Sequence, residues 1–577
     1  VFVFLSLCFS AAVGDQPKVK EACTKDGGSA CAIFEEPAPL SLMQSHAAGL
    51  AAKGAPNRAV PAVPNLEAIQ EQAQTLIVAG GAGAAPKSAG AEKAAVQLKS
   101  GSGPKLSGAA LVIWVVTAAV LMAMATFLSA MSQGECTAAM VVAEFVGTFM
   151  LVFSVGCNVL VGDPTWGVLS IACTLMVSIY ALGGVSGGNF NPAVSVGLAL
   201  SGKMPLAKLA SYVCTQLAAG IAAGAAYSML LGESFDLGAA DGYTHFEAGL
   251  AELFYTFMLV FVVLNTAASE AHAGKDQFYG LAIGFSVVAG GYGAGAISGG
   301  CFNPAVALGI DSSSSNKGGF GECLAYFSFE LLGAVLAAVL FRACRPGDFS
   351  GRATPTLATK CLSEFLGTFM LVLTVGLNVL TSSPAAVFSI AASLMCMIFA
   401  LGSVSGAHFN PAVTFAIILS GRQLINLAEA IAYMVVQVFG GVLAAFIYVA
   451  MHNGKSVALK PSASAGEALL GELVFTFLLA FVVLSVATVK SPLSQYFGLA
   501  IGSCVTAGGF AVGAVSGGVM NPAVSFGVAT ASAAMTTIDV HAPWSYCLAF
   551  SAFQLIGGFV AAAVFRLTHP AEFGAKE

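Results

Sequence analysis

The stretch S-G-G-N-F-N-P-A-V-S-V-G, residues 186–197, decides how this chain folds, and close copies of it occur three more times. The copies read SGGCFNPAVALG at 298–309, SGAHFNPAVTFA at 405–416 and SGGVMNPAVSFG at 516–527. Asn is a preferred N-cap residue, and Pro is favoured at the first helical position, where no backbone donor is needed. Each copy therefore predicts the start of a helix.

Each motif lies between apolar runs of helical length, which places the predicted helix start at the depth of a lipid bilayer. Unpaired N–H groups are tolerated at that depth only where they face protein or a watery cavity. The motifs therefore predict a pore or a binding site. Its candidate residues are Asn191, Pro192, Ala193, Asn303, Pro304, Ala305, Asn410, Pro411, Ala412, Asn521, Pro522 and Ala523.

Composition indicates an α-helical membrane protein with many spans. Of 577 residues, 57% are apolar, only 9% are charged and 66 are Gly. The formal net charge of −6 is thinly spread, and without a basic cluster we expect no binding of nucleic acid. The 14 cysteines show no C-x-x-C pair and no metal-ligand spacing. We therefore expect no metal site. We also expect no cofactor and no enzymatic activity.

Three segments precede the repeated part. Residues 1–13 resemble the apolar region of a secretory signal and are too short to span a bilayer; cleaved signal and retained anchor both stay open. Residues 14–107 have low complexity and are predicted to be disordered, although an organelle-targeting extension is an alternative. Residues 109–131 carry no charge and predict an extra transmembrane helix.

The rest of the chain contains one unit twice. AEFVGTFMLVF at 143–153 returns as SEFLGTFMLVL at 363–373, and Asn410 follows Asn191 by 219 positions. We place unit one at 138–343, a linker at 344–357, unit two at 358–568 and a tail at 569–577. Within each unit the two halves also resemble each other, and an odd number of spans per half makes an inverted repeat.

Each unit is predicted to have six transmembrane helices and two half-helices that begin at the Asn-Pro-Ala motifs. Lys203, Arg342 and Arg422 fall on one side of this arrangement, which the positive-inside rule makes cytosolic. The predicted spans are 138–161, 166–184, 206–230, 246–268, 277–296 and 320–343 in unit one, and 358–380, 384–403, 424–451, 464–489, 495–515 and 543–568 in unit two.

With four intact motifs in this register, residues 138–568 resemble two members of the aquaporin, or major intrinsic protein, family in tandem. The resemblance implies an all-α polytopic membrane protein with an hourglass-shaped unit and one pore per unit. It implies water and small neutral solutes as partners, within a lipid bilayer reached through the secretory pathway. Because the family forms tetramers, it also implies that two chains pair as a pseudo-tetramer.

The resemblance gives roles to polar residues inside the spans. The four asparagines would offer amide donors to passing molecules, and the positive ends of the half-helices would oppose cations. A carboxylate in lipid is costly, so Glu144, Glu252, Glu364 and Glu472 are expected to accept hydrogen bonds from the motif loops, with Gln216 and Gln437 assisting. His408 is either a loop brace or a pH gate, and Cys301 is a candidate pore thiol.

The chain departs from the family at the narrowest point of the pore. Relatives place an Arg directly after the second Asn-Pro-Ala, where this chain has valine. Carrying over the other positions by spacing predicts wide, apolar filters without a fixed cation, open to solutes such as glycerol or urea. The filter residues are Ile171, Gly291, Gly300 and Val306 in unit one, and Ile390, Gly509, Gly518 and Val524 in unit two.

Two other functions fit the same pattern. A non-conducting membrane scaffold or junction protein could use this fold, but it predicts bulk in the pore where glycine stands. A secondary transporter also uses inverted repeats and broken helices, but it predicts ion-coordinating groups at the midplane. The sequence favours a passive channel.

Overall fold

The computed structural model describes residues 107–573, apart from residues 133, 275–276, 316–319, 352–353, 460 and 536–541. The predictions for the signal-like segment and for the low-complexity segment up to residue 106 therefore lie outside the described residues. In the described part the chain is all-α, and 13 of its helices are long and apolar enough to cross a membrane. The protein is an integral, multi-pass membrane protein.

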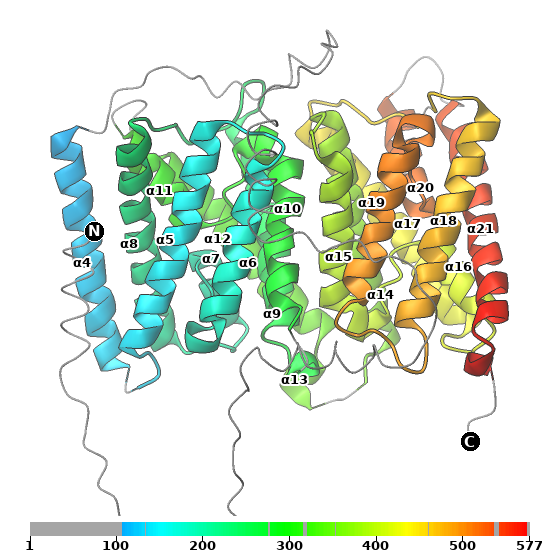
Figure 1. The fold of residues 1–577 in the computed structure, drawn as a ribbon, viewed down its shortest axis with the longest axis horizontal. Coiled ribbons are helices and arrows are strands. Elements are labelled where there is room, and N and C mark those ends of the chain that lie inside the picture. Colours follow the sequence, from blue (N-terminus) through cyan, green and yellow to red (C-terminus); the bar gives the residue numbers. More distant parts are fainter. Residues whose placement is uncertain are drawn as a thin grey trace, which may run out of the picture. The chain divides into compact units, whose positions relative to one another are not determined.

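The spanning helices follow the predicted order (Figure 1). The first is α4 (Gly108–Met131), which precedes the repeats. Unit one contains α5 (Ala138–Val161), α6 (Gly167–Ser186), α8 (Leu206–Leu231), α9 (His245–Thr266), α10 (Tyr279–Ser298) and α12 (Glu322–Cys344). Unit two contains α14 (Leu357–Leu380), α15 (Ala386–Ser405), α17 (Leu427–Met451), α18 (Ala465–Ala487), α19 (Phe497–Ser516) and α21 (Ala542–Thr568).

Four shorter helices begin at the Pro of each Asn-Pro-Ala motif. They are α7 (Pro192–Leu200) and α11 (Pro304–Ser314) in unit one, and α16 (Pro411–Leu419) and α20 (Pro522–Met535) in unit two. The predicted linker between the units contains one further short helix, α13 (Gly347–Ser350). Two 3₁₀ segments, Glu270–His272 and Pro570–Phe573, complete the described elements.

Small residues let the spanning helices approach the half-helices closely. A Cβ atom added at Gly220 or at Gly224 on α8 would lie 2.3 Å from a backbone oxygen of α11. In unit two, a Cβ atom at Gly441 on α17 would lie 2.5 Å from the carbonyl oxygen of Ala523 on α20. Without aqueous solvent between helices, such close packing is the main attraction that holds a membrane bundle together.

The two units pack through α9 and α10 of unit one against α14 and α15 of unit two. Polar contacts mark this junction: Tyr255 Oη donates to Thr374 Oγ1 at 3.1 Å, and Ser389 Oγ donates to the Ala289 carbonyl at 2.8 Å. The extra helix α4 packs on α8 instead, as Figure 1 shows in blue. α5 and α6 carry exposed apolar residues in the single chain, among them Val142, Val146 and Val177.

Candidate functional site

The paired half-helices of each unit are tied together at their N-termini by the motif asparagines. Asn191 caps α7 by accepting a bond from the Ala193 N–H at 2.8 Å, and its Nδ2 donates to the Phe302 carbonyl of the opposite loop at 2.8 Å. Asn303 reciprocates by donating to the Phe190 carbonyl at 3.0 Å. One of the two Nδ2 hydrogens on each amide is thus used between the loops, which leaves the other free.

Unit two repeats this arrangement. Asn410 Nδ2 donates to the Met520 carbonyl at 2.8 Å, and Asn521 Nδ2 donates to the Phe409 carbonyl at 2.9 Å. The structure therefore brings the asparagines together in the pairs 191 with 303 and 410 with 521. The sequence predicts these amides as donors to passing solute but does not indicate the bond between the loops.

The residue before each motif asparagine adopts a left-handed backbone conformation. The φ angles are 51° at Phe190, 51° at Phe302, 48° at Phe409 and 51° at Met520. Bulky side chains rarely adopt this conformation, and such strain persists only where the surroundings impose it. The sequence carries no glycine at these positions to announce the conformation.

A buried carboxylate in the neighbouring spanning helix holds each strained loop. Glu144 Oε1 accepts bonds from Ser186 Oγ at 2.6 Å and the Asn189 N–H at 3.0 Å, while its Oε2 accepts from the Phe190 N–H at 2.8 Å. Glu252, Glu364 and Glu472 accept the same three kinds of bond in their own loops. All four side chains are fully buried.

A glutamine adds a fourth hydrogen bond to three of these carboxylates. Each half of a unit contains one Asn-Pro-Ala motif and is called a quarter. Gln216, Gln437 and Gln554 each donate from Nε2, at 2.8 Å, to the buried glutamate of the same quarter. In the remaining quarter the equivalent position on α12 is Glu330, which faces Glu252. Neither Gln554 nor Glu330 is among the residues expected from the sequence, although an alignment of the four motif-bearing segments reveals both.

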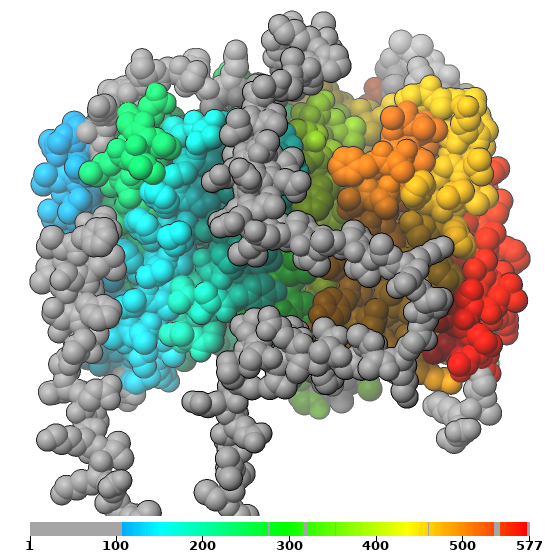
Figure 2. Space-filling model, in the orientation of Figure 1, coloured from blue at the N-terminus to red at the C-terminus, as the bar shows by residue number. Residues whose placement is uncertain are grey.

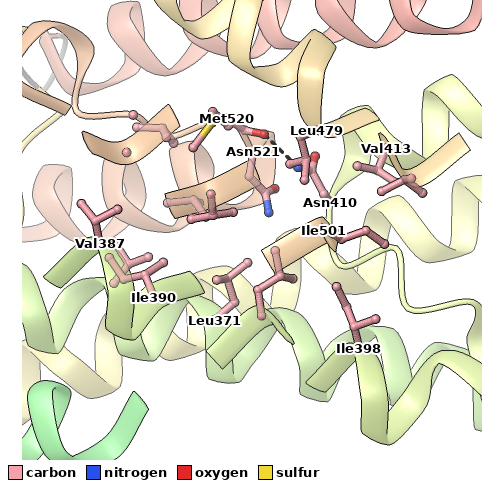
Figure 3. A pocket seen from close by; sticks show the side chains of 18 of the residues that line it. Leu371, Val387, Ile390, Ile398, Asn410, Val413, Leu479, Ile501, Met520 and Asn521 are labelled. Carbon is pink, nitrogen blue, oxygen red and sulfur yellow. Dashed lines mark hydrogen bonds between the residues drawn. The ribbon is translucent and has the colours of Figure 1, made fainter. Parts of the chain in front are cut away.

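Unit two contains a cavity that runs past its Asn-Pro-Ala motifs (Figure 3). Asn410, Asn521 and His408 are the lining residues with polar side chains, and the other lining residues are apolar or glycine. The cavity offers about 100 Å³ to the centres of water-sized molecules, which is room for several waters. Leu371, Ile398 and Ile501 form part of the apolar wall.

All four predicted filter residues of unit two, Ile390, Gly509, Gly518 and Val524, line this cavity. The glycine at 509 does not simply widen the passage, because a Cβ atom there would lie 2.5 Å from Val387 Cγ1. Val387 thus occupies part of the space that the missing side chain leaves.

The predicted filter of unit one has the same local packing. A Cβ atom at Gly291 would lie 2.5 Å from Val168 Cγ1, and Gly300 is held with φ at 71° beside Phe302. Val306 is buried and Ile171 is partly buried. Val168 is the counterpart of Val387, so the same valine fills the space beside the filter glycine in both units.

His408 belongs to both the loop and the cavity wall. Its Nδ1 lies 3.1 Å from Thr414 Oγ1, and its ring packs edge-on against Tyr433. Cys301 is buried and stands where Val519 lines the cavity of unit two. Among the described residues, no cluster of three or more His, Cys, Asp or Glu side chains could hold a metal ion.

Comparison with known proteins finds one family throughout the helical part of the chain. The sequence model of the major intrinsic protein family matches residues 130–341, 280–381 and 351–565. The chain is 33% identical to aquaporin NIP1-4 of Oryza sativa subsp. japonica, over 32% of this chain and 71% of that relative. It is 32% identical to glycerol uptake facilitator protein-like 6 of Lactiplantibacillus plantarum, over 35% of this chain and 95% of that relative.

A solved structure, the aquaglyceroporin from Plasmodium falciparum, aligns with 38% of this chain and 100% of its own length, at 19% identity and a TM-score of 0.33. Each of these three alignments covers between 32% and 38% of the chain.

Proposed function

This chain belongs to the major intrinsic protein family, and on that premise we propose that it is a passive membrane channel for water and small uncharged solutes, with one pore in each unit. The names of its relatives, which include aquaporins and a glycerol uptake facilitator, support this class of substrate.

The observation that carries the proposal is the cavity of unit two. Two half-helix N-termini meet beside it, each equivalent to about half a positive charge, and this potential opposes cations while neutral molecules pass. Asn410 and Asn521 retain one amide hydrogen each for a solute oxygen. No charged side chain lines the cavity, so nothing there would bind an ion tightly or couple it to transport.

We propose further that the filters of both units are apolar and lack a fixed cation. The residue after the second Asn-Pro-Ala is Val306 in unit one and Val524 in unit two, and Val524 lines the cavity. An apolar constriction without a charged donor favours solutes that carry their own apolar surface, such as glycerol, over strongly hydrated ones.

Reconstitution into liposomes tests the channel and its filter together. Vesicles with the protein should shrink and re-swell in glycerol gradients much faster than vesicles without it. Val306→Arg with Val524→Arg should lower glycerol flux several-fold, because each Arg adds a bulky, hydrated donor to the constriction. Val306→Ile with Val524→Ile is the uncharged control. Flux no higher than in protein-free vesicles would contradict the channel function and favour the scaffold alternative. Equal glycerol flux in the Arg and Ile variants would contradict the proposed role of the two valines in the filter.

We also propose that a second copy of this chain covers the free faces of α5, α6, α18 and α19. Within the most apolar window of each helix, 78% of α14 and 72% of α15 is buried, against 39% of α5 and 22% of α6. In the same way, 83% of α9 is buried against 33% of α18. The helix faces that meet at the junction of the two units thus have exposed counterparts elsewhere on the chain. Two chains related by a two-fold axis would pack through these counterparts and arrange four pores in a ring.

Polar side chains on the free face support this pairing. Asn158 Nδ2 donates to Ser170 Oγ at 3.0 Å, as Asn378 Nδ2 donates to Ser389 Oγ at 2.9 Å at the junction of the units. Ser389 is fully buried, whereas Ser170 is exposed and would face lipid in a single chain. Hydroxyls facing hydrocarbon are unfavourable, so a protein partner on this face lowers the free energy. Figure 2 shows part of α5, in cyan, without another described helix over it.

Disulfide trapping tests the pairing. Ser389 donates to Ala289 at the junction, and the counterparts of this pair on the free faces are Ser170 and Ala507. A chain with Ser170→Cys and Ala507→Cys should form covalent pairs of chains on mild oxidation in the membrane. Ser170→Cys with Val339→Cys, on the exposed side of α12, is the matched control, and the unmodified chain gives the background from native cysteines. Covalent pairing no stronger than in these controls would overturn the arrangement.

A further inference from the structure

The four motif quarters share a polar cluster that one quarter breaks. In three quarters a glutamine bridges the buried glutamate and a hydroxyl four residues after the motif asparagine. In unit two, for example, Gln554 Nε2 donates to Glu472 Oε2 at 2.8 Å and lies 3.5 Å from Ser525 Oγ. The same bridge joins Gln216 to Ser195 and Gln437 to Thr414. The amides of Gln216 and Gln554 both donate and accept hydrogen bonds in this cluster, and the amide of Gln437 donates.

In the fourth quarter, which is the second half of unit one, both the glutamine and the hydroxyl-bearing residue are replaced. Glu330 stands at the glutamine position and Ala307 at the hydroxyl position. Glu330 Oε1 accepts a bond from the Asn303 N–H at 2.8 Å, and Glu252 Oε2 accepts a bond from the N–H of the preceding residue, Phe302, at 2.6 Å. The two carboxyl groups therefore bind neighbouring backbone groups of the same loop. Glu330 Oε2 has no hydrogen-bond partner among the described residues, and both side chains are fully buried.

Two neighbouring carboxyl groups in a buried site cannot both be ionised at low cost, because like charges repel strongly where water is absent. A single proton resolves this conflict, since the protonated carboxyl becomes a donor to the other, which stays an acceptor. Glu252 must remain the acceptor, because it holds Ser298 and the N–H groups of Cys301 and Phe302. The donor is therefore Glu330.

We propose that Glu252 and Glu330 form a proton-binding site that holds one proton between them and clamps the second Asn-Pro-Ala loop of unit one. With the proton bound, Glu330 donates a hydrogen bond to Glu252, as Gln554 donates to Glu472 in unit two. When the proton leaves to water, two buried carboxylates face each other across α9 and α12. Their repulsion loosens the bond to Asn303, whose side-chain amide would line the pore proposed for unit one.

The groups around the pair do not supply a compensating charge. The Cys301 thiol faces it from the motif loop, and the Tyr326 hydroxyl and Cys323 thiol face it from α12, with Asp311 of α11 beside Cys323. The Tyr326 hydroxyl donates to the Ser298 carbonyl at 2.7 Å and not to the pair. The ion pairs among the described residues include neither carboxyl.

Infrared spectroscopy of the protein in lipid tests the site without reference to transport. At neutral pH the wild type should show the carbonyl stretch of a buried protonated carboxylic acid, and this band should vanish in Glu330→Gln. The matched gain of function is Gln554→Glu with Ser525→Ala, which copies the pair into unit two and should add a second such band. Identical carboxylic acid bands in the wild type and in Glu330→Gln would overturn the proposal.

A transport measurement tests the link to the pore, and it rests on the proposed channel function. As alkaline pH removes the infrared band, glycerol flux through the wild type should fall toward the flux that unit two carries alone. Flux through Glu330→Gln should not change over that range, and flux through the unit-two copy should fall further. An equal pH dependence in the wild type and in Glu330→Gln would overturn the link. Absence of flux in every variant would instead defeat the channel function, and the infrared result would still decide the proton site.

Discussion

At the scale of single residues, each half of a unit places a strained residue against a buried carboxylate. Phe190, Phe302, Phe409 and Met520 keep φ near 50°, at a cost of roughly 1–3 kcal/mol each. The bonds from their N–H groups to the glutamates, between 2.6 and 2.8 Å long, offset this cost. The glutamates therefore matter first as supports for the loops.

Glu472→Gln tests this support. A glutamine has one acceptor oxygen and would turn its NH₂ group toward other donors, among them the Met520 N–H and Gln554 Nε2. Leaving buried donors unpaired costs about 1–3 kcal/mol, so the thermal midpoint in detergent should fall by several degrees. Glu467→Gln, on the same helix but in its exposed capping box, is the control. Equal losses in the two variants would contradict a supporting role for Glu472.

Sequence reveals a functional or structural residue when its chemical type is unusual for its surroundings. A glutamate in an apolar span or an Asn-Pro pair after a glycine turn is visible without coordinates. The left-handed Phe and Met are not, because nothing in their side chains favours positive φ. Glu330 is visible in the sequence as a charged residue in a span. Its role becomes clear only when its position is compared with those of Gln216, Gln437 and Gln554.

At the scale of helices, the motif both ends one helix and starts the next. Gly187, Gly299, Gly406 and Gly517 are left-handed C-caps of the preceding spans, with φ between 86° and 97°. The sequence prediction ended those spans one or two residues too early. It assigned the motif serine to the loop, whereas Ser186 ends α6 and donates to Glu144. The helix starts were clearer, because Asn-Pro specifies an N-cap and a first residue directly.

The packing of a spanning helix on a half-helix gives a second prediction. In Gly441→Ala the new methyl group would meet the Ala523 carbonyl at 2.5 Å, so α17 and α20 must move apart. Overpacking of this kind costs about 1–3 kcal/mol and should lower both the thermal midpoint and glycerol flux. Gly513→Ala on α19 is the control, because a Cβ atom there has no neighbour within 4 Å. A Gly441 variant as stable as the Gly513 variant would show that the contact is not tight.

At the scale of the whole molecule, the repeat period reveals how many units there are but not which faces join them. Helix faces that meet lipid and faces that meet another helix are equally apolar, so hydropathy does not separate them. The structure separates them by polar contacts at the junction, such as Tyr255 with Thr374 and Ser389 with Ala289. Two further contacts lie where the chain leaves the membrane, and each gives a prediction.

The first is His452, directly after α17, whose ring packs edge-on against Tyr243 of unit one. Burial lowers the pKa of His452, although its Nδ1 bond to the Tyr448 carbonyl opposes this. The unfolded imidazole titrates near 6.5, so the unfolded chain takes up the proton first as pH falls. The contact should therefore be fully present at pH 8 and lose stability as pH falls below about 6.5.

Thermal midpoints between pH 8 and pH 5 measure this effect. His452→Gln should remove part of the acid loss, since glutamine does not titrate. His245→Gln is the control, because the His245 side chain is exposed. A wild type and a His452 variant with the same pH profile would exclude His452 as the sensitive group.

The second contact is Arg345, which follows α12 and reaches across to unit two. Its Nε donates to Asn265 Oδ1 at 2.6 Å, and its Nη2 donates to the Ala400 carbonyl at 2.8 Å and to Ser403 Oγ at 2.7 Å. Burial lowers the pKa of Arg345 to about 10, so it stays charged at neutral pH. A charged donor to a buried acceptor such as the Ala400 carbonyl contributes about 1.5–3 kcal/mol, so this side chain is a substantial polar link between the units.

Arg345→Met keeps an unbranched, flexible stem but removes the guanidinium and its donors, so the Asn265 and Ala400 oxygens lose a partner inside the protein. The junction should then open before either unit unfolds, because the bonds within each unit are unchanged. Limited proteolysis of the segment around residue 350 should speed up at temperatures well below the thermal midpoint. Arg342→Met is the matched control: Arg342 is exposed and its guanidinium lies over the Phe349 ring of the same segment. If the Arg342 variant is cut as fast as the Arg345 variant, the segment itself and not the link between the units governs the cleavage.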